Sequence, residues 1–583
     1  MCGILGCPET IAEHFPRAME RLAFRGRDQS AAVSMDSYRL GCQRLAITDP
    51  SSVQPLVAGV PGRRTAIVFN GSLAGSDALA RELEAIGEAP LSRNDAELPL
   101  RLYRARGLRG LERLRGQFAF GILDEERGCL VLGRDVFGEK PLFVREQEHG
   151  LPAFASTLAG LQALHPEPLP GPDPLDVARF LRFGWLDLEE SCFGVRVRSF
   201  PRSRIRLYDR SGLVEECRLD SVTTSRTGVR LPELLTRSVS ERLTGDRPIG
   251  LFLSGGIDSA CLAWALARLN RRVLCLSLDL EGLEPESGRA RAIAACLGLE
   301  HRAWTAGPEL LETLPELIAS AGHPLGDPSI LALSALAKHA VDSGIGIALS
   351  GEGGDELFLG YRRQRALPWI ELARTLLPPF FRQALARGAR GVSQRSRLRR
   401  ALVGGYAELL SVADPADIAE LVPGVEGEGP EPLRLPDHAR DTELEGYLPW
   451  DLCPKADLGG LSAGLEIRLP FLDPRLRGFA DRRARRSGES HGKPLLRELL
   501  SAALPNELRS GPKRGFAVPL AAWLRVSSWP REVLGDPSLA ACPWSRERAL
   551  EWLRELEQGD DRRAPLLFNL CSLATWWQQS RWR

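Results

Sequence analysis

The stretch Leu253-Ser254-Gly255-Gly256-Ile257-Asp258-Ser259 lies between a short apolar run and a helical pattern. Its two glycines allow backbone N–H groups to approach an anion closely, and the N-terminus of the following helix adds a partial positive charge. The hydroxyls of Ser254 and Ser259 are further donors, and the Asp258 carboxylate suits Mg²⁺ bound to phosphate oxygens. The stretch predicts a phosphate-binding turn in an α/β sheet. In isolation it also fits a glycine-rich turn whose Asp and Ser side chains cap the helix.

A second motif, Ser350-Gly351-Glu352-Gly353-Gly354-Asp355-Glu356, follows another apolar run. Open α/β sheets bind ligands at the carboxyl ends of their strands, and both motifs take that position. Asp355 suits a second metal contact, and Glu352 suits a positioned acid or base. The alternative is an acidic surface loop, but two such motifs in one chain favour a shared phosphate site.

Strand and helix patterns alternate around these motifs. Alternation with short buried strands predicts a doubly wound parallel sheet. Residues 370–583 are mostly helical in pattern and add to that sheet. The expected strands are 249–253, 273–278 and 346–349, and the expected helices are 260–269 and 290–297.

Residues 1–160 have a different character. Short runs rich in Phe and Val stand between Gly, Asn and Asp residues, which predicts stacked antiparallel sheets. Strands are expected at 66–69, ending at Asn70-Gly71, and at 117–124 and 129–133. A Pro-rich loop is expected from His165 to Pro174. The polar break at 210–228 predicts a division into domains at 1–212 and 228–583.

The composition excludes several classes of protein. The chain has 583 residues, 44% of them hydrophobic, and 76 Lys and Arg against 75 Asp and Glu give a net charge of +1. This balance argues against a nucleic-acid coat or a polybasic membrane binder, and no apolar run approaches the roughly 18 residues of a membrane span. Twelve cysteines without metal-ligand spacing, and no secretory signal, predict a reduced cytoplasmic protein. Arginine clusters at 395–400 and 482–486 are interpreted as solvated helix faces.

Cys2 is a candidate nucleophile. Removal of Met1 would place a thiol and an α-amino group on one terminal residue, and that amine, with a pKa near 8, can act as the local base for the thiol. The position alone is weak evidence, because any chain can carry Cys there.

The two glycine-rich motifs resemble the pyrophosphate-binding loops of the asparagine synthetase family. Further segments resemble other motifs of that family, so the resemblance covers essentially the whole chain. Three of the chain's five lysines lie in these segments, which indicates that an ammonium rather than a guanidinium is required there. The segments are His323-Pro324, Asp327-Pro328-Ser329, Lys455-Ala456-Asp457, the substrate-site signature Leu465 to Asp473, taken as helical, Lys493 to Arg497, and Lys513 to Leu520.

The resemblance implies that the C-terminal half, an ATP-pyrophosphatase domain, activates a carboxylate as its acyl-adenylate with ATP and Mg²⁺. Glu352 would take a proton from the attacking ammonia, and Lys493 would neutralise charge on the transferring phosphoryl group. Asp258 and Asp355 would hold Mg²⁺. The ATP-binding residues implied are Leu253, Ser254, Gly255, Gly256, Asp258, Ser259, Leu278, Ser350 and Gly351.

The N-terminal half resembles a class II glutamine amidotransferase domain. The resemblance implies a four-layer αββα N-terminal-nucleophile sandwich with Cys2 as the nucleophile. Asn70 and the Gly71 N–H would form the oxyanion hole, Arg44 would pair with the glutamine carboxylate, and Asp95 would hold its ammonium. The segments that carry the resemblance are 25–28, 43–49, 69–71, 93–97, 116–124 and 134–142.

Three positions depart from the amidotransferase pattern. Ser72 stands where the family usually has a Glu that helps to hold the substrate ammonium, so glutamine binding is expected to weaken by about 1–3 kcal/mol if the contact is buried and not replaced. Arg27 replaces the usual Pro, and Ser30 stands where Gly is common. The nucleophile and oxyanion hole are therefore expected to be intact and the specificity pocket altered.

The leading functional hypothesis is a glutamine-dependent asparagine synthetase. Ammonia released at Cys2 would attack a β-aspartyl-adenylate, giving asparagine, AMP, pyrophosphate and glutamate. One alternative keeps the chemistry but amidates a different acid or closes a lactam, and another is a non-catalytic scaffold or regulator. The expected partners are glutamine, ATP and aspartate, with no nucleic acid or membrane, and a homodimer is the candidate assembly.

Overall fold

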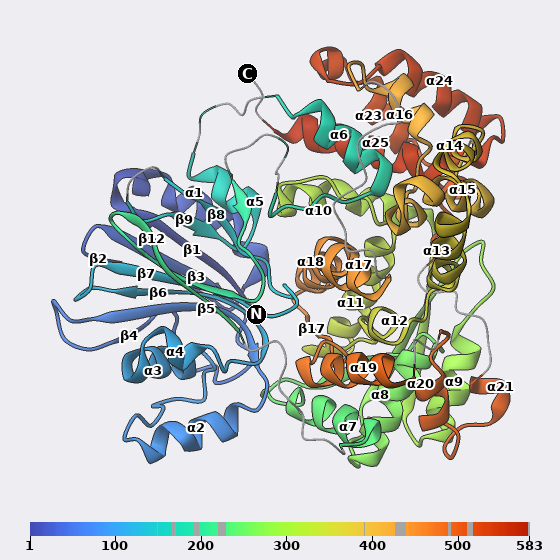
Figure 1. Cartoon of the computed structure of the whole chain (residues 1–583). Coiled ribbons are helices and arrows are strands. Elements are labelled where there is room, and N and C mark those ends of the chain that lie inside the picture. Colours follow the sequence, from blue (N-terminus) through green and yellow to red (C-terminus); the bar gives the residue numbers. More distant parts are fainter. Residues whose placement is uncertain are drawn as a thin grey trace.

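A computed structural model describes residues 1–147, 150–165, 167, 171–190, 193, 197–219, 229–389, 391–425, 439–487, 491–509 and 517–580. Figure 1 shows the sheet-rich N-terminal half on one side and the more helical C-terminal half on the other, in contact along a long face. None of the described helices is long and apolar enough to cross a membrane.

The N-terminal half contains two six-stranded sheets, ordered β10-β8-β9-β1-β3-β2 and β12-β11-β7-β6-β5-β4. Neighbouring strands in both sheets are antiparallel. The strands are β1 (Cys2–Pro8), β2 (Gln29–Met35), β3 (Tyr38–Arg44), β4 (Leu56–Ala58), β5 (Thr65–Leu73), β6 (Gly116–Asp124), β7 (Cys129–Arg134), β8 (Phe143–Arg145), β9 (Ala153–Ala155), β10 (Arg198–Ser199), β11 (Arg204–Asp209) and β12 (Gly212–Arg218).

The two sheets pack face to face with helices on the outer faces. In β5, Ala66 and Val68 pack between the sheets, whereas Ile67 and Phe69 belong to the core on the helical side, as the two-residue period of a strand requires. This arrangement confirms the predicted αββα sandwich (Figure 1). The helices of the sandwich are α1 (Phe15–Arg21), α2 (Ser76–Ala85), α3 (Glu97–Arg106), α4 (Leu108–Leu111) and α5 (Leu158–Ala163). Helix α6 (Pro174–Phe183) follows them in sequence but packs against α16 (Pro415–Leu421) and α25 (Ala564–Gln579) of the other half (Figure 1).

The C-terminal half is built on a parallel sheet of order β15-β14-β13-β16-β17. The chain starts in the middle strand, extends the sheet to one side and then to the other, so β13 and β16 flank the point where the strand order reverses. This confirms the predicted doubly wound sheet and places both glycine-rich loops at its switch point. The strands are β13 (Ile249–Phe252), β14 (Leu274–Leu280), β15 (Glu300–Ala306), β16 (Ile347–Leu349) and β17 (Glu466–Arg468).

Helices cover both faces of this sheet and form the predicted helical addition at its C-terminal side (Figure 1). They are α7 (Leu231–Glu241), α8 (Ile257–Arg268), α9 (Ser287–Cys296), α10 (Leu314–Ala321), α11 (Ser329–Asp342), α12 (Gly354–Phe358), α13 (Leu367–Leu376), α14 (Pro379–Arg387), α15 (Gln394–Gly404), α16 (Pro415–Leu421), α17 (Ala439–Thr442), the π-helical segment Glu443–Leu452, α18 (Cys453–Ala463), α19 (Pro474–Ser487), α20 (Pro494–Leu499), α21 (Asn506–Arg509), α22 (Leu520–Val526), α23 (Trp529–Gly535), α24 (Arg546–Glu557) and α25 (Ala564–Gln579).

Two local expectations are wrong. Asn70-Gly71 does not end a strand, because β5 continues to Leu73 and pairs with β6 through both residues. The signature that begins at Leu465 is not helical. Gly464 ends α18 with a positive φ of +84°, and the buried residues Glu466–Arg468 then pair with β16 as a fifth strand.

Several sequence features lie partly or wholly outside the described residues. These include Lys513 to Phe516, most of the Pro-rich loop, the polar loop at 424–436 and most of the expected domain boundary, since 220–228 are not described. Strand β12 adds to the N-terminal sheet as far as Arg218. The division at 1–212 and 228–583 stays a prediction.

Candidate active sites

The two glycine-rich loops lie against each other at the carboxyl edge of the parallel sheet. A Cβ on Gly351 would lie 3.0 Å from Asp258 Cβ, and one on Gly354 would lie 2.4 Å from Asp258 Oδ1. Both glycines are therefore needed for the close approach of the second loop to the first. The structure thus brings the two motifs, far apart in sequence, into one site.

The first loop has the features expected of an anion cradle. Gly255 has a φ of +72°, which favours glycine, and Gly256 precedes the first turn of α8. Ser254 Oγ and Ser259 Oγ are 3.3 Å apart across the loop. Backbone N–H groups and two hydroxyls are thus grouped at a helix N-terminus, the arrangement that binds phosphate.

The residues expected around the nucleotide lie at neighbouring strand ends. Leu253 follows β13, and Leu278 lies in β14 beside it. Ser350 and Gly351 follow β16, and the Ser350 N–H donates to Arg468 O on β17 at 2.9 Å. All of the expected ATP-binding residues therefore border one edge of the sheet.

Lys493 joins the two loops. Its Nζ is ion-paired with Asp258 Oδ2 and lies 2.5 Å from Asp355 Oδ1. Lys493 is buried and has a φ of +58° at the start of α20, and Gly360 leaves room for its stem, since a Cβ there would lie 2.0 Å from Lys493 Cε. Two carboxylates and one ammonium thus meet where transferring phosphates are expected.

These carboxylates suit a divalent cation. Asp258 Oδ1 is buried and has no hydrogen-bond partner among the described residues, so it has a free oxygen ligand to offer. No group of three or more His, Cys, Asp or Glu side chains in the described chain could hold a metal alone. Mg²⁺ is usually bound by one or two carboxylates together with substrate phosphates, which matches this pair.

Glu352 lies beside a buried charge pair. Lys455 Nζ donates to Asp327 Oδ2 at 3.0 Å and to Ser329 Oγ at 3.0 Å, and it lies 3.6 Å from Glu352 Oε1. Burial lowers the pKa of the Lys455 ammonium, but the carboxylates of Asp327 and Glu352 raise it by more. The ammonium therefore stays charged. Lys455 and Asp327 lie in family motifs that carry no expected role, and the structure places both next to the expected acid or base.

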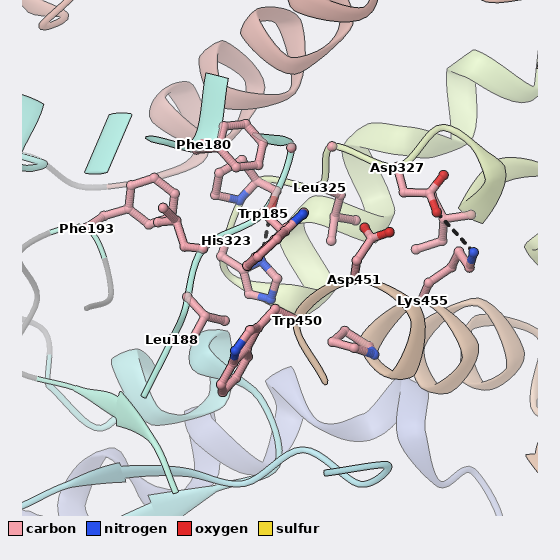
Figure 2. Close-up of a pocket in the computed structure, with 16 residues that line it drawn as sticks. Phe180, Trp185, Leu188, Phe193, His323, Leu325, Asp327, Trp450, Asp451 and Lys455 are labelled. Atoms are coloured by element: carbon pink, nitrogen blue, oxygen red, sulfur yellow. Dashed lines mark hydrogen bonds and ion pairs between the residues drawn. The ribbon is translucent and has the colours of Figure 1, made fainter. Parts of the chain in front are cut away.

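A cavity adjoins this charge pair (Figure 2). Asp327, Asp451 and Lys455 lie at one end of it, and Trp185, Trp450 and other apolar side chains form its walls. Its lining comes from the segment after α6 in the N-terminal half and from the C-terminal half. The cavity therefore lies between the two halves.

The Cys2 site is assembled around β1 and β5. The Cys2 N–H donates to Asn70 Oδ1 at 2.9 Å, and the Asn70 side chain is fully buried. Asn70 Nδ2 is a buried donor with no acceptor among the described residues. Gly71 has a φ of +148°, and a Cβ there would lie 2.0 Å from Gln117 O. An unsatisfied buried donor beside a nucleophile is what an oxyanion hole provides.

The environment of Cys2 favours the thiolate. Hydrogen bonding from the Cys42 side chain, together with the amino group of Met1 and with Arg44, outweighs burial and lowers the pKa of the Cys2 thiol to about 6. Cys42 lies on β3, which pairs with β1. A thiol with this pKa is largely ionised at pH 7, as a nucleophilic cysteine requires.

The expected glutamine-binding side chains line the same pocket as Cys2. Arg44 donates to Thr48 O and Asp49 O at 2.8 Å each and also to Ser52 O, so its guanidinium is held firmly. Asp95 Oδ2 accepts from the Leu73 N–H at 3.0 Å. Burial raises the pKa of the Asp95 carboxyl to about 6.

Ser72 borders this pocket in the place of the usual Glu, and two residues that were not expected here lie close by. Glu466 and Arg468 on β17 line the pocket, although they belong to the C-terminal half. Gln117 Nε2 and Arg468 Nε both donate to Glu466 Oε1, at 3.2 and 2.6 Å. Burial raises the pKa of the Glu466 carboxyl, but Arg468 and the amino group of Met1 lower it by more, to about 2.

Three buried charged side chains link the two halves. Asp457 on α18 lies 2.8 Å from Arg25 Nη1 and 3.2 Å from Lys140 Nζ, and all three side chains are about 2% exposed or less. The Arg25 Nε also donates to Cys2 O at 3.2 Å. The Cys2 site is therefore held in place by contacts that reach into the C-terminal half.

Comparisons with known proteins match each half of the chain to a family. A family model described as asparagine synthase matches residues 230–578, and one described as glutamine amidotransferase domain matches residues 1–217. A Mycobacterium tuberculosis protein named "Putative asparagine synthetase [glutamine-hydrolyzing]" is 30% identical over 90% of this chain and 89% of its own length.

Two further relatives differ in name. Asparagine synthetase [glutamine-hydrolyzing] 1 of Bacillus subtilis is 26% identical over 92% of this chain and 90% of its own length. Amidase chyE of Penicillium rubens is 27% identical over 61% of this chain and 56% of its own length.

Proposed function

The chain belongs to the asparagine synthase family, and we propose that it uses ATP and ammonia released from glutamine to convert a carboxylic acid into its amide. The observation that carries this proposal is the meeting of Asp258, Asp355 and Lys493 at the switch point of the parallel sheet. These groups lie where the phosphates of ATP would be bound by the first loop. Because Glu352 lies at the start of the second loop, an acceptor acid can be activated and aminated in the same place.

Activation begins with attack of an acceptor carboxylate oxygen on the α-phosphorus of ATP. The bond to the β-phosphate oxygen breaks, pyrophosphate leaves, and an acyl-adenylate forms. Lys493 neutralises the negative charge that develops on the transferring phosphoryl group. Asp258 and Asp355 would hold Mg²⁺, which supplies further charge neutralisation when bound.

Glutamine is hydrolysed at the other site. The Cys2 thiolate attacks the side-chain amide carbon, while Asn70 Nδ2 and the Gly71 N–H stabilise the oxyanion. Ammonia leaves, and water releases glutamate from the thioester. Arg44 binds the glutamine carboxylate and Asp95 its ammonium.

Ammonia then attacks the carbonyl carbon of the acyl-adenylate. Glu352 takes the proton that the nitrogen loses, AMP leaves, and the amide remains. Lys455 Nζ lies 3.6 Å from Glu352 Oε1 and so helps to hold this carboxylate in position.

Aspartate, giving asparagine, is the acceptor in the first form of this proposal, in line with the names of the relatives. A second candidate keeps this chemistry but amidates a different acid, and the relative named amidase chyE supports it. A homodimer and a cytoplasmic location stay predictions.

The test follows nucleotide products by mass spectrometry. The full chain receives ATP, Mg²⁺ and aspartate with glutamine in one sample and with ammonium in another. AMP, pyrophosphate and an amide in both samples are the expected result. Amide with ammonium only would refute the working glutaminase, and ATP binding without AMP formation in either sample would refute aspartate as the acceptor.

A further inference from the structure

Helices α13 and α14 expose large apolar side chains to solvent. Helix α14 has no buried residue, and α13 buries only Leu367 and Ile370. The turn between the two helices reads Leu376-Leu377-Pro378-Pro379-Phe380-Phe381, and all of these residues except Leu377 are exposed. The large exposed side chains of the two helices, here called the apolar corner, are Trp369 (73%), Leu372 (49%), Leu376 (70%), Phe380 (65%), Phe381 (53%) and Leu385 (38%).

The apolar corner forms one surface. Its three side chains on α13 are spaced by three and four residues, which places them on one face of that helix. Only Leu377 and Pro378 separate the two helices, and the rings of Phe380 and Phe381 lie 4.7 Å apart between centroids. Figure 1 shows both helices at the edge of the C-terminal half opposite to the N-terminal sheets. Contiguous exposed apolar surfaces of this kind mark interaction sites.

The apolar corner lies in a strongly basic segment. Residues 362–403 contain eleven arginines against one acidic residue, Glu371, so the net charge of this segment is +10. Arg374, Arg382 and Arg387, which belong to α13 and α14, form no ion pair with a carboxylate among the described residues. The balanced charge of the whole chain, from which no membrane partner is expected, therefore conceals one positive segment.

Helix α15 adds to this positive charge. It packs against α14 and carries Arg395, Arg397 and Arg399. Burial and the like charges of Arg400 and Arg363 lower the pKa of Arg397 to about 10. The positive charges are thus crowded, and a negatively charged partner would reduce their repulsion.

The charge of the segment decides between partners. In a symmetric dimer the same surface would contact itself and bring the arginines of both copies together, which is unfavourable. An anionic lipid surface instead offers phosphates to the arginines and an apolar layer to the side chains of the corner. Basic helices with Trp, Phe and Leu on one face are typical of segments that lie in a membrane interface. The exposed fractions of Trp369 and Phe380 show that they protrude, which suits insertion into a soft layer.

We propose that the apolar corner is a docking site for an anionic lipid surface. Trp369, Leu376 and Phe380 enter the boundary between headgroups and acyl chains. Neighbouring arginines contact the lipid phosphates, among them the exposed Arg387, which lies seven residues after Phe380 and so on the same face of α14. This attachment lies in the plane of the membrane and goes beyond the proposed amide synthesis.

The experiment measures co-sedimentation of the full chain with lipid vesicles. One set contains phosphatidylcholine alone, and the other contains about 30% phosphatidylglycerol to make the surface negative. Each arginine near such a surface adds about fivefold to binding, so three of them should give about a hundredfold preference for the anionic vesicles. Raising the salt concentration to about 0.5 M should remove most of this preference, because it screens the charges.

Variants locate the binding site. Phe380→Ser combined with Phe381→Ser should lower binding to anionic vesicles by at least about tenfold, since two apolar rings are lost. Leu91→Ser is the matched control, because Leu91 is 83% exposed in the N-terminal half and should not matter. Arg387→Glu should also weaken binding, whereas Arg109→Glu, at an exposed position on α4, should not. Thermal unfolding of each variant checks its fold.

Three outcomes would overturn the docking site. These are equal binding to neutral and anionic vesicles, no binding to either, or the same effect from Leu91→Ser as from the double Phe variant. A polyglutamate peptide tests the alternative partner: binding of this peptide without binding of anionic vesicles would replace the lipid surface by an acidic protein. None of these measurements depends on AMP formation, so they stand whether or not the proposed ligase activity is found.

Discussion

The two proposed sites are built in opposite ways. The phosphate site takes its charged groups from two contiguous loops at one sheet edge and from Lys493, all within the C-terminal half. The Cys2 pocket takes its groups from three strands, a loop before α3 and a strand of the other half. The residues of the phosphate site all come from one half of the chain, whereas those of the Cys2 pocket come from both halves.

Strand β17 is the element that the two sites share. Its backbone accepts the Ser350 N–H at the start of the second phosphate loop, while its side chains Glu466 and Arg468 line the Cys2 pocket. One three-residue strand of the C-terminal half thus borders both proposed sites.

The largest effect should come from Cys2→Ala. Removal of the nucleophile should lower glutamine-dependent amidation by about 10⁴-fold or more, because the thioester cannot form. Activity with ammonium should remain within about twofold, since the phosphate site contains no residue of the N-terminal half. Glutamate release and AMP formation measure the two activities separately, and Cys296→Ala, at an exposed cysteine, is the matched control. An equal loss of both activities would refute the separation of the two sites.

Lys493→Met tests the other site. Loss of the ammonium that joins Asp258 and Asp355 should lower AMP formation by about 10²–10³-fold with either nitrogen source. Glutamine hydrolysis without ATP should persist. Lys338→Met on α11 is the control, because Lys338 is exposed. Unchanged AMP formation would exclude Lys493 from phosphoryl transfer.

Asp457→Asn tests whether the Cys2 half depends on the other half. Arg25 and Lys140 would be left buried with a neutral partner, so the free energy of unfolding should fall by about 3–5 kcal/mol. Chemical denaturation measures this loss. Asp561→Asn, which breaks an exposed pair with Arg525, should cost at most about 1 kcal/mol. A loss as small as that of the control would show that the buried pair is not important for joining the halves.

The phosphate site could be predicted from the sequence because its chemistry lies in short contiguous stretches. Glycines, serines and carboxylates next to an apolar run already specify the end of a buried strand and the start of a helix. The structure adds only that the two loops touch, at Gly351 and Gly354 against Asp258. Their roles remain predictions until activity is measured.

The Cys2 pocket was only partly predictable. Asn70-Gly71 has the composition of a turn, yet pairing with β6 keeps it within a strand. Glu466 and Arg468 were read as part of a helical signature. In a strand they lie two residues apart and share a face, so both point toward the pocket while Ile467 enters the core. Such long-range pairing cannot be seen in a single sequence.

Ser72→Glu tests the departure from the amidotransferase pattern. A carboxylate beside Asp95 should lower KM for glutamine by about fivefold to a hundredfold, equivalent to about 1–3 kcal/mol of added ammonium binding. Ser72→Gln, of equal size without the charge, should give much less. Glutamate release in the absence of ATP measures both variants. A higher KM for the Glu variant than for the Gln variant would show that Asp95 and Glu466 already supply the necessary charge.

The pH dependence of glutamine hydrolysis needs no substitution, and it concerns the Cys2 pocket alone. The pKa values of Cys2 and Asp95 are both about 6, and both groups act in their ionised forms. Activity should therefore be flat above pH 7 and fall as pH drops through 6, to about a tenth at pH 5 for each group that must lose its proton. A midpoint near 9 would mean that Cys42 and the amino terminus do not stabilise the thiolate. Asp95→Asn assigns the midpoint: if the fall remains at the same pH, it belongs to Cys2, since only the thiol then titrates there.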